Sequence, residues 1–345
     1  MRRKKRVLPK VFGVFFVLVL LGVIAGSAGA LYFVSPVAQT GQTEKVEVVS
    51  GASAKGIAEN LEEQGLIRNK LVFDLLCRYY EVNADLQVGV YQISPAMSMR
   101  EIIDVLKAGP KVVRVSVSIP EGFRVDQIFD KLAESGFGDQ ESFYDAAEVV
   151  SAEKFAFLQE VPKTVIEPGN RLEGFLFPDT YLLDKDMTPQ QVLEMMLARF
   201  EDELTDEVKQ KLAARGMSIY DWATIASVVE REALVDDERP LVASVFENRL
   251  AKGMKFESCA TVEYVLKENK PFLSYADIKL ESPYNTYIHE GLPPGPIACP
   301  GKKSLQAALE PADTKYLFFC AKGDGTQAFA ETNAEHEKNV AKYVN

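Results

Sequence analysis

The sequence has few of the side chains that bind transition metals. It contains two histidines and four cysteines in 345 residues, and they fit no CxxC or similarly tight ligand spacing. Structural zinc sites need four such ligands at close intervals, so we predict no metal site and no cofactor. The cysteines are expected to be free, buried thiols, with a Cys259–Cys299 disulfide as the alternative in an oxidising compartment. They are Cys77, Cys259, Cys299 and Cys320.

Acidic side chains outnumber basic ones after the amino terminus. Basic side chains crowd the first ten residues, whereas the rest of the chain is acidic and the net charge is −11. An acidic body argues against nucleic acid as a partner. No charged residue occurs from Val11 to Val34, a run of about 24 residues, and about 20 apolar residues cross a bilayer as a helix.

This run predicts a transmembrane anchor at residues 11–34, preceded by a basic cytoplasmic segment at residues 1–10. The positive-inside rule then predicts a single-pass protein of the cytoplasmic membrane, with a cytoplasmic amino terminus and an extracytoplasmic body after about Ser35. Ala28-Gly29-Ala30 resembles a signal-peptidase site. The apolar run is longer than the usual core of a signal peptide, so we expect the anchor to remain uncleaved.

A strand-turn-helix pattern occurs twice at a constant offset. Residues 46–65 carry V-x-V-x-x-G followed by an apolar helical pattern that ends in glycine, and residues 117–136 carry V-x-I-x-x-G with the same continuation. Alternating apolar residues predict a strand, the inner glycine a turn, and the last glycine the end of a helix. Residues 35–45, small and polar, are predicted to be a linker.

The segment from residue 46 to residue 112 predicts a small α+β unit. After the first copy come a helical pattern at 69–80, an alternating strand at 87–93 and another helical pattern at 98–109. A β-α-α-β order in an exported, membrane-tethered chain resembles the LysM type of glycan-binding module. A plain spacer domain is the alternative, because the sequence identifies no exposed aromatic platform.

Residues 143–215 are predicted to be mainly helical, with one interruption. The run E-G-F-L-F-P-D-T-Y at 173–181 combines aromatic residues with glycine and proline, which favours a rigid loop. Such a loop could line a cleft or fill the core.

A carboxyl group with the position of a general acid lies on the next predicted helix, residues 218–233. At about 100° per residue, Glu230 falls inside an apolar arc, Glu232 at its edge, and Arg231 opposite. Burial against apolar neighbours raises the pKa of a carboxyl, so Glu230 could stay protonated near neutral pH. The arc consists of Ile219, Trp222, Ala223, Ala226, Val229 and Ala233.

An ordered series of motifs extends from this helix almost to the carboxyl terminus. The series is A-S-V-V-E-R-E at 226–232, E-R at 238–239, V-A-S-V-F at 242–246, N-R-L at 248–250, G-M at 253–254, T-V at 261–262, S-P-Y-N-T-Y at 282–287, G-L-P-P-G-P-I at 291–297, P-G at 300–301, S-L at 304–305 and E-H at 335–336. Together with the 173–181 run, I-P-E-G at 119–122 and the anchor, it resembles the endolytic murein transglycosylase family MltG (YceG-like).

The resemblance implies a reaction and a catalytic residue. The family assigns catalysis to the first glutamate of its V-E-(K/R)-E motif, here Glu230, and cleaves the β-1,4 bond between N-acetylmuramic acid and N-acetylglucosamine within a strand. Glu230 would protonate the glycosidic oxygen and then take the proton of the muramoyl C6 hydroxyl, leaving a 1,6-anhydromuramic end. The substrate supplies the nucleophile, so one glutamate suffices, unlike the paired acids of glycoside hydrolases.

A substrate-binding shell is predicted from motif position and chemistry. Asn285 could hydrogen-bond an N-acetyl group, and tyrosines could stack on sugar faces. For Asn248 and Arg249 a purely structural role is the alternative. The double proline at 293–294 is expected to fix a loop at the rim of a cleft. The predicted shell comprises Asn285, Tyr284, Tyr287, Glu238, Asn248, Arg249, Ser258 and Thr261.

The sequence departs from the family pattern in three places. Where relatives have Gln-(Ser/Thr)-Asp-Pro-Thr, residues 257–261 are E-S-C-A-T, a customary histidine is replaced by Gln327, and an asparagine is replaced by Glu337. These changes leave Glu230 in place. They alter side chains that the family places around it, so the substrate preference stays open and an attenuated enzyme is an alternative.

Two other classes of function remain open at this stage. One is a non-catalytic glycan-binding or scaffold protein of the division or elongation machinery, and the other is a hydrolytic glycosidase that pairs Glu230 with Glu238. Glu232 points about 160° away from Glu230 on a helix, so these two cannot flank one bond. A serine acyl-transfer site at Ser151 is disfavoured, because no companion motif is present.

The predicted fold class is α+β, with a transmembrane helix, a LysM-like module and a mixed α/β catalytic domain. The expected partners are peptidoglycan strands, the cell membrane and peptidoglycan synthases or division proteins. The predicted segments are 1–10 cytoplasmic, 11–34 anchor, 35–45 linker, 46–112 LysM-like module, 113–215 second repeat copy with a helical subdomain, and 216–345 catalytic domain.

Overall fold

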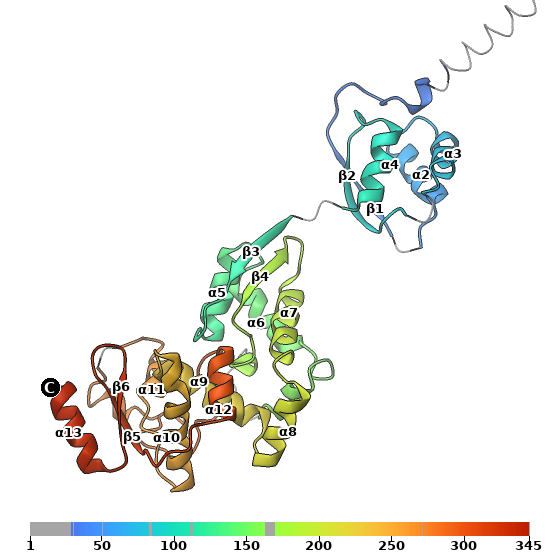
Figure 1. Cartoon of the computed structure of the whole chain (residues 1–345). Coiled ribbons are helices and arrows are strands. Elements are labelled where there is room, and N and C mark those ends of the chain that lie inside the picture. Colours follow the sequence, from blue (N-terminus) through green and yellow to red (C-terminus); the bar gives the residue numbers. More distant parts are fainter. Residues whose placement is uncertain are drawn as a thin grey trace, which may run out of the picture. The chain divides into compact units, whose positions relative to one another are not determined.

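The chain folds into two compact units that divide after residue 112 (Figure 1). The fold is mixed α+β, as predicted, and the described sheets are three antiparallel pairs of strands. The computed structural model describes residues 29, 31–49, 51–82, 85–110, 113–162, 170–270 and 272–344.

The predicted anchor, residues 11–34, lies outside these residues except for Gly29 and 31–34. No helix among the described residues is both long and apolar enough to span a membrane.

Among its described residues, the first unit contains a two-stranded sheet that packs against helices. Its elements are β1 (Glu44–Val48), α2 (Ala54–Glu63), α3 (Lys70–Tyr79), β2 (Gly89–Ile93) and α4 (Met99–Ala108). The predicted β-α-α-β order and the helix after it are therefore confirmed. β1 and β2 pair with Val46 opposite Tyr91, and both residues are fully buried in a core shared with the helices. β1 begins at Glu44, inside the predicted linker.

Residues 35–37 are held against this unit. The Arg68 guanidinium donates hydrogen bonds to the carbonyl oxygens of Ser35 at 2.7 Å and Val37 at 3.1 Å, and it also stacks over the Tyr32 ring. This part of the predicted linker therefore packs on the first unit.

The second unit begins with the second copy of the repeat. Its strands and α-helices are β3 (Arg114–Ser118), α5 (Val125–Glu134), α6 (Gln140–Val149), β4 (Thr180–Asp184), α7 (Pro189–Glu201), α8 (Asp206–Arg215), α9 (Ile219–Glu232), α10 (Arg239–Ala251), α11 (Cys259–Leu266), α12 (Lys302–Leu309), β5 (Phe318–Ala321), β6 (Gln327–Ala330) and α13 (Asn333–Tyr343). Short 3-10 helices lie at Ala156–Glu160, Asn170–Leu172, Asp236–Glu238 and Asp277–Lys279.

Both copies of the repeat fold as the sequence predicts. Each is a strand, a turn with a glycine at positive φ (Gly51 at +78° and Gly122 at +76°) and a helix followed by a second such glycine. β3 pairs with β4, with Val117 opposite Tyr181. β4 is a strand that the sequence analysis missed, because Thr180 and Tyr181 were assigned to the 173–181 loop.

The 173–181 loop fills the core. Phe175 and Leu176 are fully buried and Phe177 is 4% exposed, so the structure favours the core-filling alternative over a cleft lining. The same hydrophobic core runs from Val117 to Leu309. This core contains residues from both sides of residue 215. The predicted boundary at that residue, between a helical subdomain and a catalytic domain, stays a prediction.

The predicted helix around Glu230 is confirmed as α9. Ser218 caps it, since the Ser218 hydroxyl oxygen accepts the Asp221 N–H at 2.9 Å. Its central residues, 222–229, are buried on every side rather than along one arc.

All four cysteines are free. Cys77 and Cys299 are buried as expected. Cys259 is exposed and Cys320 is half-buried, which corrects the expectation of buried thiols at these two positions.

Candidate active site around Glu230

Glu230 lies near the carboxyl end of α9 with 6% of its side chain exposed. One carboxylate oxygen contacts the Arg239 guanidinium at 3.1 Å, and the other accepts the Gly301 N–H at 3.0 Å. The apolar arc of the helix predicts apolar neighbours for this carboxyl group, but the structure also places polar groups against it. Glu230 is held between a cation and the backbone N–H group at the start of α12.

A single segment after the double proline runs along α9. The Tyr220 hydroxyl donates to the Pro294 carbonyl at 3.0 Å, and the Ile297 N–H donates to the Ser227 hydroxyl at 3.0 Å. The contact between Gly301 and Glu230 is the last of this series. Because Tyr220, Ser227 and Glu230 are spaced seven and three residues apart, they lie on one side of the helix. The proline-rich loop thus positions the α12 amino terminus against Glu230.

The turn of the second repeat copy reaches the same place. The Gly122 N–H donates to the Cys299 carbonyl at 2.9 Å, and the Cys299 N–H donates to the Phe123 carbonyl at 2.8 Å. A side-chain carbon on Gly122 would lie 3.6 Å from Cγ of Glu230, so the turn packs directly on the catalytic candidate.

Arg239 is the residue that the sequence analysis missed. It is 6% exposed, binds Glu230, donates to the Ser304 hydroxyl and contacts Asp236 at 3.2 Å. Asp236 in turn pairs with Lys303. The E-R motif at 238–239 carries the signal, although only its glutamate belongs to the predicted shell.

Glu121 brings a second carboxyl group to this cluster. It precedes Gly122 in the turn, and a side chain at Gly301 would collide with its carboxyl group. Burial of that carboxyl and the nearby charge of Glu230 raise its pKa, whereas Arg239 lowers it. The I-P-E-G motif was noted in the sequence, yet its glutamate was not predicted as a site residue.

Asn285 is fully buried and bonded within its own loop. Its amide donates to the Ile278 carbonyl at 3.1 Å and the Leu280 carbonyl at 2.8 Å, and its side-chain oxygen accepts the Tyr287 N–H. The predicted contact with an N-acetyl group would require an exchange of these bonds.

The contacts of Asn248 and Arg249 support the structural alternative. The Asn248 amide donates to the carbonyls of Thr314 and Tyr316, both at 3.0 Å. Arg249 is 6% exposed and donates to three backbone carbonyls, at Lys255, Phe256 and Leu317.

Ser258 and Thr261 belong to a buried hydroxyl network. The Thr261 hydroxyl lies 2.8 Å from that of Thr286, which also accepts the Ser258 N–H. The Ser258 hydroxyl donates to Glu232, whose pKa burial raises. Glu232 therefore points to the amino terminus of α11 and not to Glu230, as the helical geometry predicted.

Glu238 binds a strand and not Glu230. Its two carboxylate oxygens accept the Gln327 N–H at 3.1 and 3.0 Å. The Gln327 side chain donates to the Glu232 carbonyl at 3.2 Å. Gln327, one of the departures from the family pattern, thus contacts the Glu238 carboxylate and the main chain of Glu232. Glu337, another departure, accepts a bond from Asn333 on the exposed α13.

Tyr284 and Tyr287 are half-buried. The Tyr284 ring packs on Tyr264 with centroids 4.9 Å apart, and the Tyr287 hydroxyl lies 3.1 Å from the Cys259 thiol. A side chain on Gly295 would approach the Tyr284 hydroxyl, so Tyr284 borders the double-proline loop.

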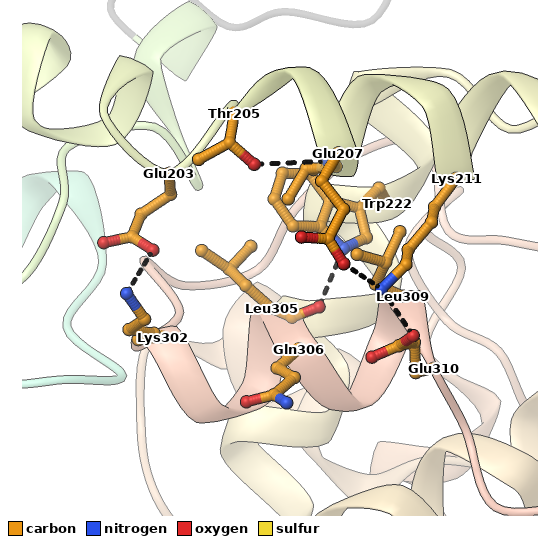
Figure 2. A pocket seen from close by; sticks show the side chains of 11 residues that line it. Glu203, Thr205, Glu207, Lys211, Trp222, Lys302, Leu305, Gln306, Leu309 and Glu310 are labelled. Atoms are coloured by element: carbon orange, nitrogen blue, oxygen red, sulfur yellow. Dashed lines mark hydrogen bonds and ion pairs between the residues drawn. The ribbon is translucent and has the colours of Figure 1, made fainter.

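A pocket of about 260 Å³ lies elsewhere on the unit, between α8, α9 and α12 (Figure 2). Trp222 and Leu305 line it and are tied by a 2.8 Å bond from the indole N–H to the Leu305 carbonyl, while Lys302 and Glu203 pair at its edge. None of the predicted site residues lines this pocket. Within the described residues, no group of three or more His, Cys, Asp or Glu side chains could hold a metal ion.

Comparison with known proteins matches almost the whole chain. The sequence model of the YceG-like family matches residues 46–342. A Bacillus subtilis protein named endolytic murein transglycosylase is 32% identical over 314 residues, covering 88% of this chain and 85% of that protein. A protein of the same name from Streptococcus pneumoniae is 29% identical over 322 residues, and the match covers 87% of this chain but 58% of that protein.

A solved structure agrees with these matches. The crystal structure of a putative yceG-like protein from Listeria monocytogenes superimposes with a TM-score of 0.59 and 31% identity, over 87% of this chain and 99% of that one. The extent of the family match and the 32% identity to the B. subtilis protein lead to one assignment: the chain belongs to the YceG-like family.

Proposed function

We propose that this chain is an endolytic murein transglycosylase that cleaves the β-1,4 bond between N-acetylmuramic acid and N-acetylglucosamine within glycan strands. The observation that carries the proposal is the buried Glu230 carboxyl, held between Arg239 and the Gly301 N–H in a member of the YceG-like family. The B. subtilis and S. pneumoniae relatives bear this activity in their names.

Glu230 acts first as an acid and then as a base. In its protonated form it transfers a proton to the glycosidic oxygen as the bond to C1 breaks, and an oxocarbenium-like sugar forms. The ionised Glu230 then removes the proton from the muramoyl C6 hydroxyl while that oxygen attacks C1. The product is a 1,6-anhydromuramic end, and the proton returns to Glu230.

The two contacts of Glu230 stabilise its ionised form, which exists between the two proton transfers. After the first transfer the side chain carries a full negative charge, which the Arg239 guanidinium and the Gly301 N–H both stabilise. The N–H lies at the amino terminus of α12, where the helix dipole favours an anion. These groups are in place before the charge develops, which lowers the cost of forming it.

The contacts of the other acids disfavour the hydrolytic alternative. Glu238 is bonded to the Gln327 N–H and Glu232 to Ser258, so neither is aimed at Glu230. The scaffold alternative is disfavoured by the activity that the B. subtilis and S. pneumoniae relatives bear in their names.

The first unit and the amino terminus have proposed roles as well. The β1-α2-α3-β2 order and the antiparallel pairing of β1 with β2 support a LysM-like glycan-binding module at residues 46–112. The uncharged run at 11–34 supports a single-pass anchor in the cytoplasmic membrane with an extracytoplasmic body. The partners are then peptidoglycan strands and membrane-bound synthases or division proteins.

Mass spectrometry of digested glycan tests the proposal. The full chain in detergent is incubated with purified glycan strands in water enriched in heavy oxygen. A transglycosylase yields anhydro ends without heavy oxygen, because the attacking oxygen comes from the sugar. Reducing ends that carry one heavy oxygen would instead identify a hydrolase, and uncut strands would favour the scaffold alternative.

A further inference from the structure

The predicted anchor ends next to the start of α3. Residues 31–34 are helical and close the uncharged run, and the Arg68 guanidinium binds the residues that follow them. It donates to the carbonyl oxygens of residues 35–37 and stacks over the Tyr32 ring at 4.6 Å. Because Arg68 directly precedes Asn69, which caps α3, the end of the run and the start of α3 are held close together.

α3 presents an apolar stripe to solvent. On its inner side, Phe73 and Cys77 are fully buried in the core of the first unit. On its outer side, Leu71, Leu75 and Tyr79 are 68%, 64% and 77% exposed. These three, the α3 stripe, are spaced four residues apart and therefore lie on one face of the helix. Single apolar residues are common on protein surfaces, whereas a contiguous apolar patch marks a site of interaction.

The charged side chains of α3 are paired. Lys70 contacts Glu59 at 3.1 Å, and Arg78 contacts Asp74 at 2.7 Å. Together these four side chains carry no net charge, so their attraction for a charged partner is weak. The α3 stripe therefore fits an apolar partner.

The composition and size of the α3 stripe distinguish between apolar partners. Two of its three side chains are leucines, which offer a sugar ring no aromatic face to stack on. A stable dimer buries about 800 Å² on each partner, which is more than three side chains supply. Surface helices with such an apolar side enter the acyl boundary of a bilayer, and tyrosine is enriched at the interface between membrane and water.

We propose that α3 lies along the extracytoplasmic surface of the membrane, with Leu71 and Leu75 at the acyl boundary and Tyr79 at the level of the headgroups. The inference rests on the membrane anchor that the proposed function includes. The contact of Arg68 with residues 35–37 holds the first unit where the chain leaves the bilayer, and the α3 stripe gives the unit a second attachment. Two attachments determine which side of the unit faces the lipid.

The opposite side of the first unit then faces away from the bilayer. α3 packs on α2, which packs on β1, and Figure 1 shows α3 at one side of the unit and β2 at the other. Val90 on β2 alternates with the buried Tyr91, so its side chain points away from the core, and it is 53% exposed. Val90 is thus an exposed apolar residue on the far side of the sheet.

Photocrosslinking in vesicles tests the contact with lipid. The full chain, with benzoylphenylalanine in place of Leu75, is reconstituted into vesicles of phosphatidylethanolamine and phosphatidylglycerol, and purified glycan strands are added. The matched control carries the same group in place of Val90. After irradiation, mass spectrometry identifies what each position has captured. We expect about tenfold more lipid adducts at position 75 than at position 90, because only the α3 stripe reaches the acyl chains.

A second variant tests the contact of Arg68. Arg68→Gln frees residues 35–37, so lipid adducts at position 75 are expected to fall several-fold while circular dichroism stays the same. Arg100→Gln is the matched control, since it also removes a guanidinium from a tyrosine ring, that of Tyr80, but leaves residues 35–37 in place. Equal adducts in the two variants would overturn the role given to Arg68.

The captured partner decides between the alternatives. Equal lipid adducts at positions 75 and 90, or adducts at position 75 to a second copy, to residues 1–30 of the same chain or to glycan, would overturn the inference. Flotation of the vesicles separates it from the anchor. A chain that does not float with the vesicles refutes the anchor as well, whereas a floating chain without lipid adducts at position 75 refutes this inference only.

Discussion

The two copies of the strand-turn-helix pattern share a local structure and differ in what they contact. In the first copy, β1 and α2 pack into the core of the small first unit. In the second, β3 and α5 join the large core, and the turn between them packs on Glu230. The backbone form of the turn is the same in both, since Gly51 and Gly122 have φ values of +78° and +76°. The local sequence therefore determines the backbone conformation of the turn, and segments that are distant in the sequence determine what the turn contacts.

The helix starts show the same contrast. α2 is capped by its own neighbour, because the Ser53 hydroxyl accepts the Gly56 N–H at 3.2 Å. The equivalent residue before α5 is Arg124, and the Val125 N–H instead donates at 3.1 Å to Glu173, which lies 48 residues further along the chain. The first copy is capped within itself, whereas the second depends on a buried carboxyl from the 173–181 loop.

The largest expected effect comes from the buried ion pair of the second unit. Arg239→Met leaves the Glu230 carboxylate buried without its cation, which is expected to lower the free energy of unfolding by about 3–5 kcal/mol. Lys70→Met breaks the exposed pair with Glu59 in the first unit, and because solvent screens that pair, the free energy of unfolding is expected to stay nearly unchanged. Denaturant unfolding measures both, and equal losses would contradict the contrast.

The buried cap at Glu173 predicts a pH effect on stability. Burial raises its pKa from 4.5 to about 8 in the folded chain, so the folded state binds the extra proton between these values. Stability is then present in full below pH 4.5 and declines as the pH rises to about 8, by an amount on the order of 5 kcal/mol. Glu173→Gln still accepts the Val125 N–H without titrating, so its melting temperature should fall less over that range. An identical decline in both proteins would contradict the assignment.

Alanine at the two turn glycines compares the copies directly. Gly51→Ala and Gly122→Ala force a side chain into left-handed backbone, at a cost of about 1–2 kcal/mol each. Only Gly122→Ala displaces the turn that touches Glu230, so it alone should slow the formation of anhydro ends, by about tenfold or more. Matched thermal melts and rate measurements test this, and similar rates for the two variants would refute it.

The smallest effect is expected at the local cap. Ser53→Ala removes the hydroxyl that accepts the Gly56 N–H and should cost about 1 kcal/mol. Because the cap belongs to the first unit, hydrogen exchange should speed up in α2 while that of α5 stays the same. Faster exchange in α5 as well would show that the two caps are not independent.

The sequence predicted local structure better than it predicted the site. Helical periodicity predicts the helix that carries Glu230. Alternating apolar residues followed by glycine predict the strand and the turn of both repeat copies. Arg239, Glu121 and Gly301 meet Glu230 from separate elements, and no periodicity connects them. The family resemblance marked their motifs but not the contacts between them.

The predicted polar shell shows why side-chain chemistry alone does not identify the residues that contact a substrate. Asn285 and Arg249 were chosen for groups that suit a sugar, yet those groups hold their own backbone in place. A buried polar side chain must first satisfy its bonds within the fold, and the sequence does not show which donors and acceptors are near. β4 was missed because glycine, proline and aromatic residues precede it, which is typical of a loop.

The most direct test of the account is the rate at which Glu230→Gln forms anhydro ends on purified glycan strands, measured with the full chain against the wild type and Glu134→Gln, at an exposed glutamate on α5. We expect a loss of about a thousandfold in Glu230→Gln, with the fold retained by circular dichroism, because the amide can neither donate nor accept the required proton. A folded Glu230→Gln that forms anhydro ends at the wild-type rate would contradict the account.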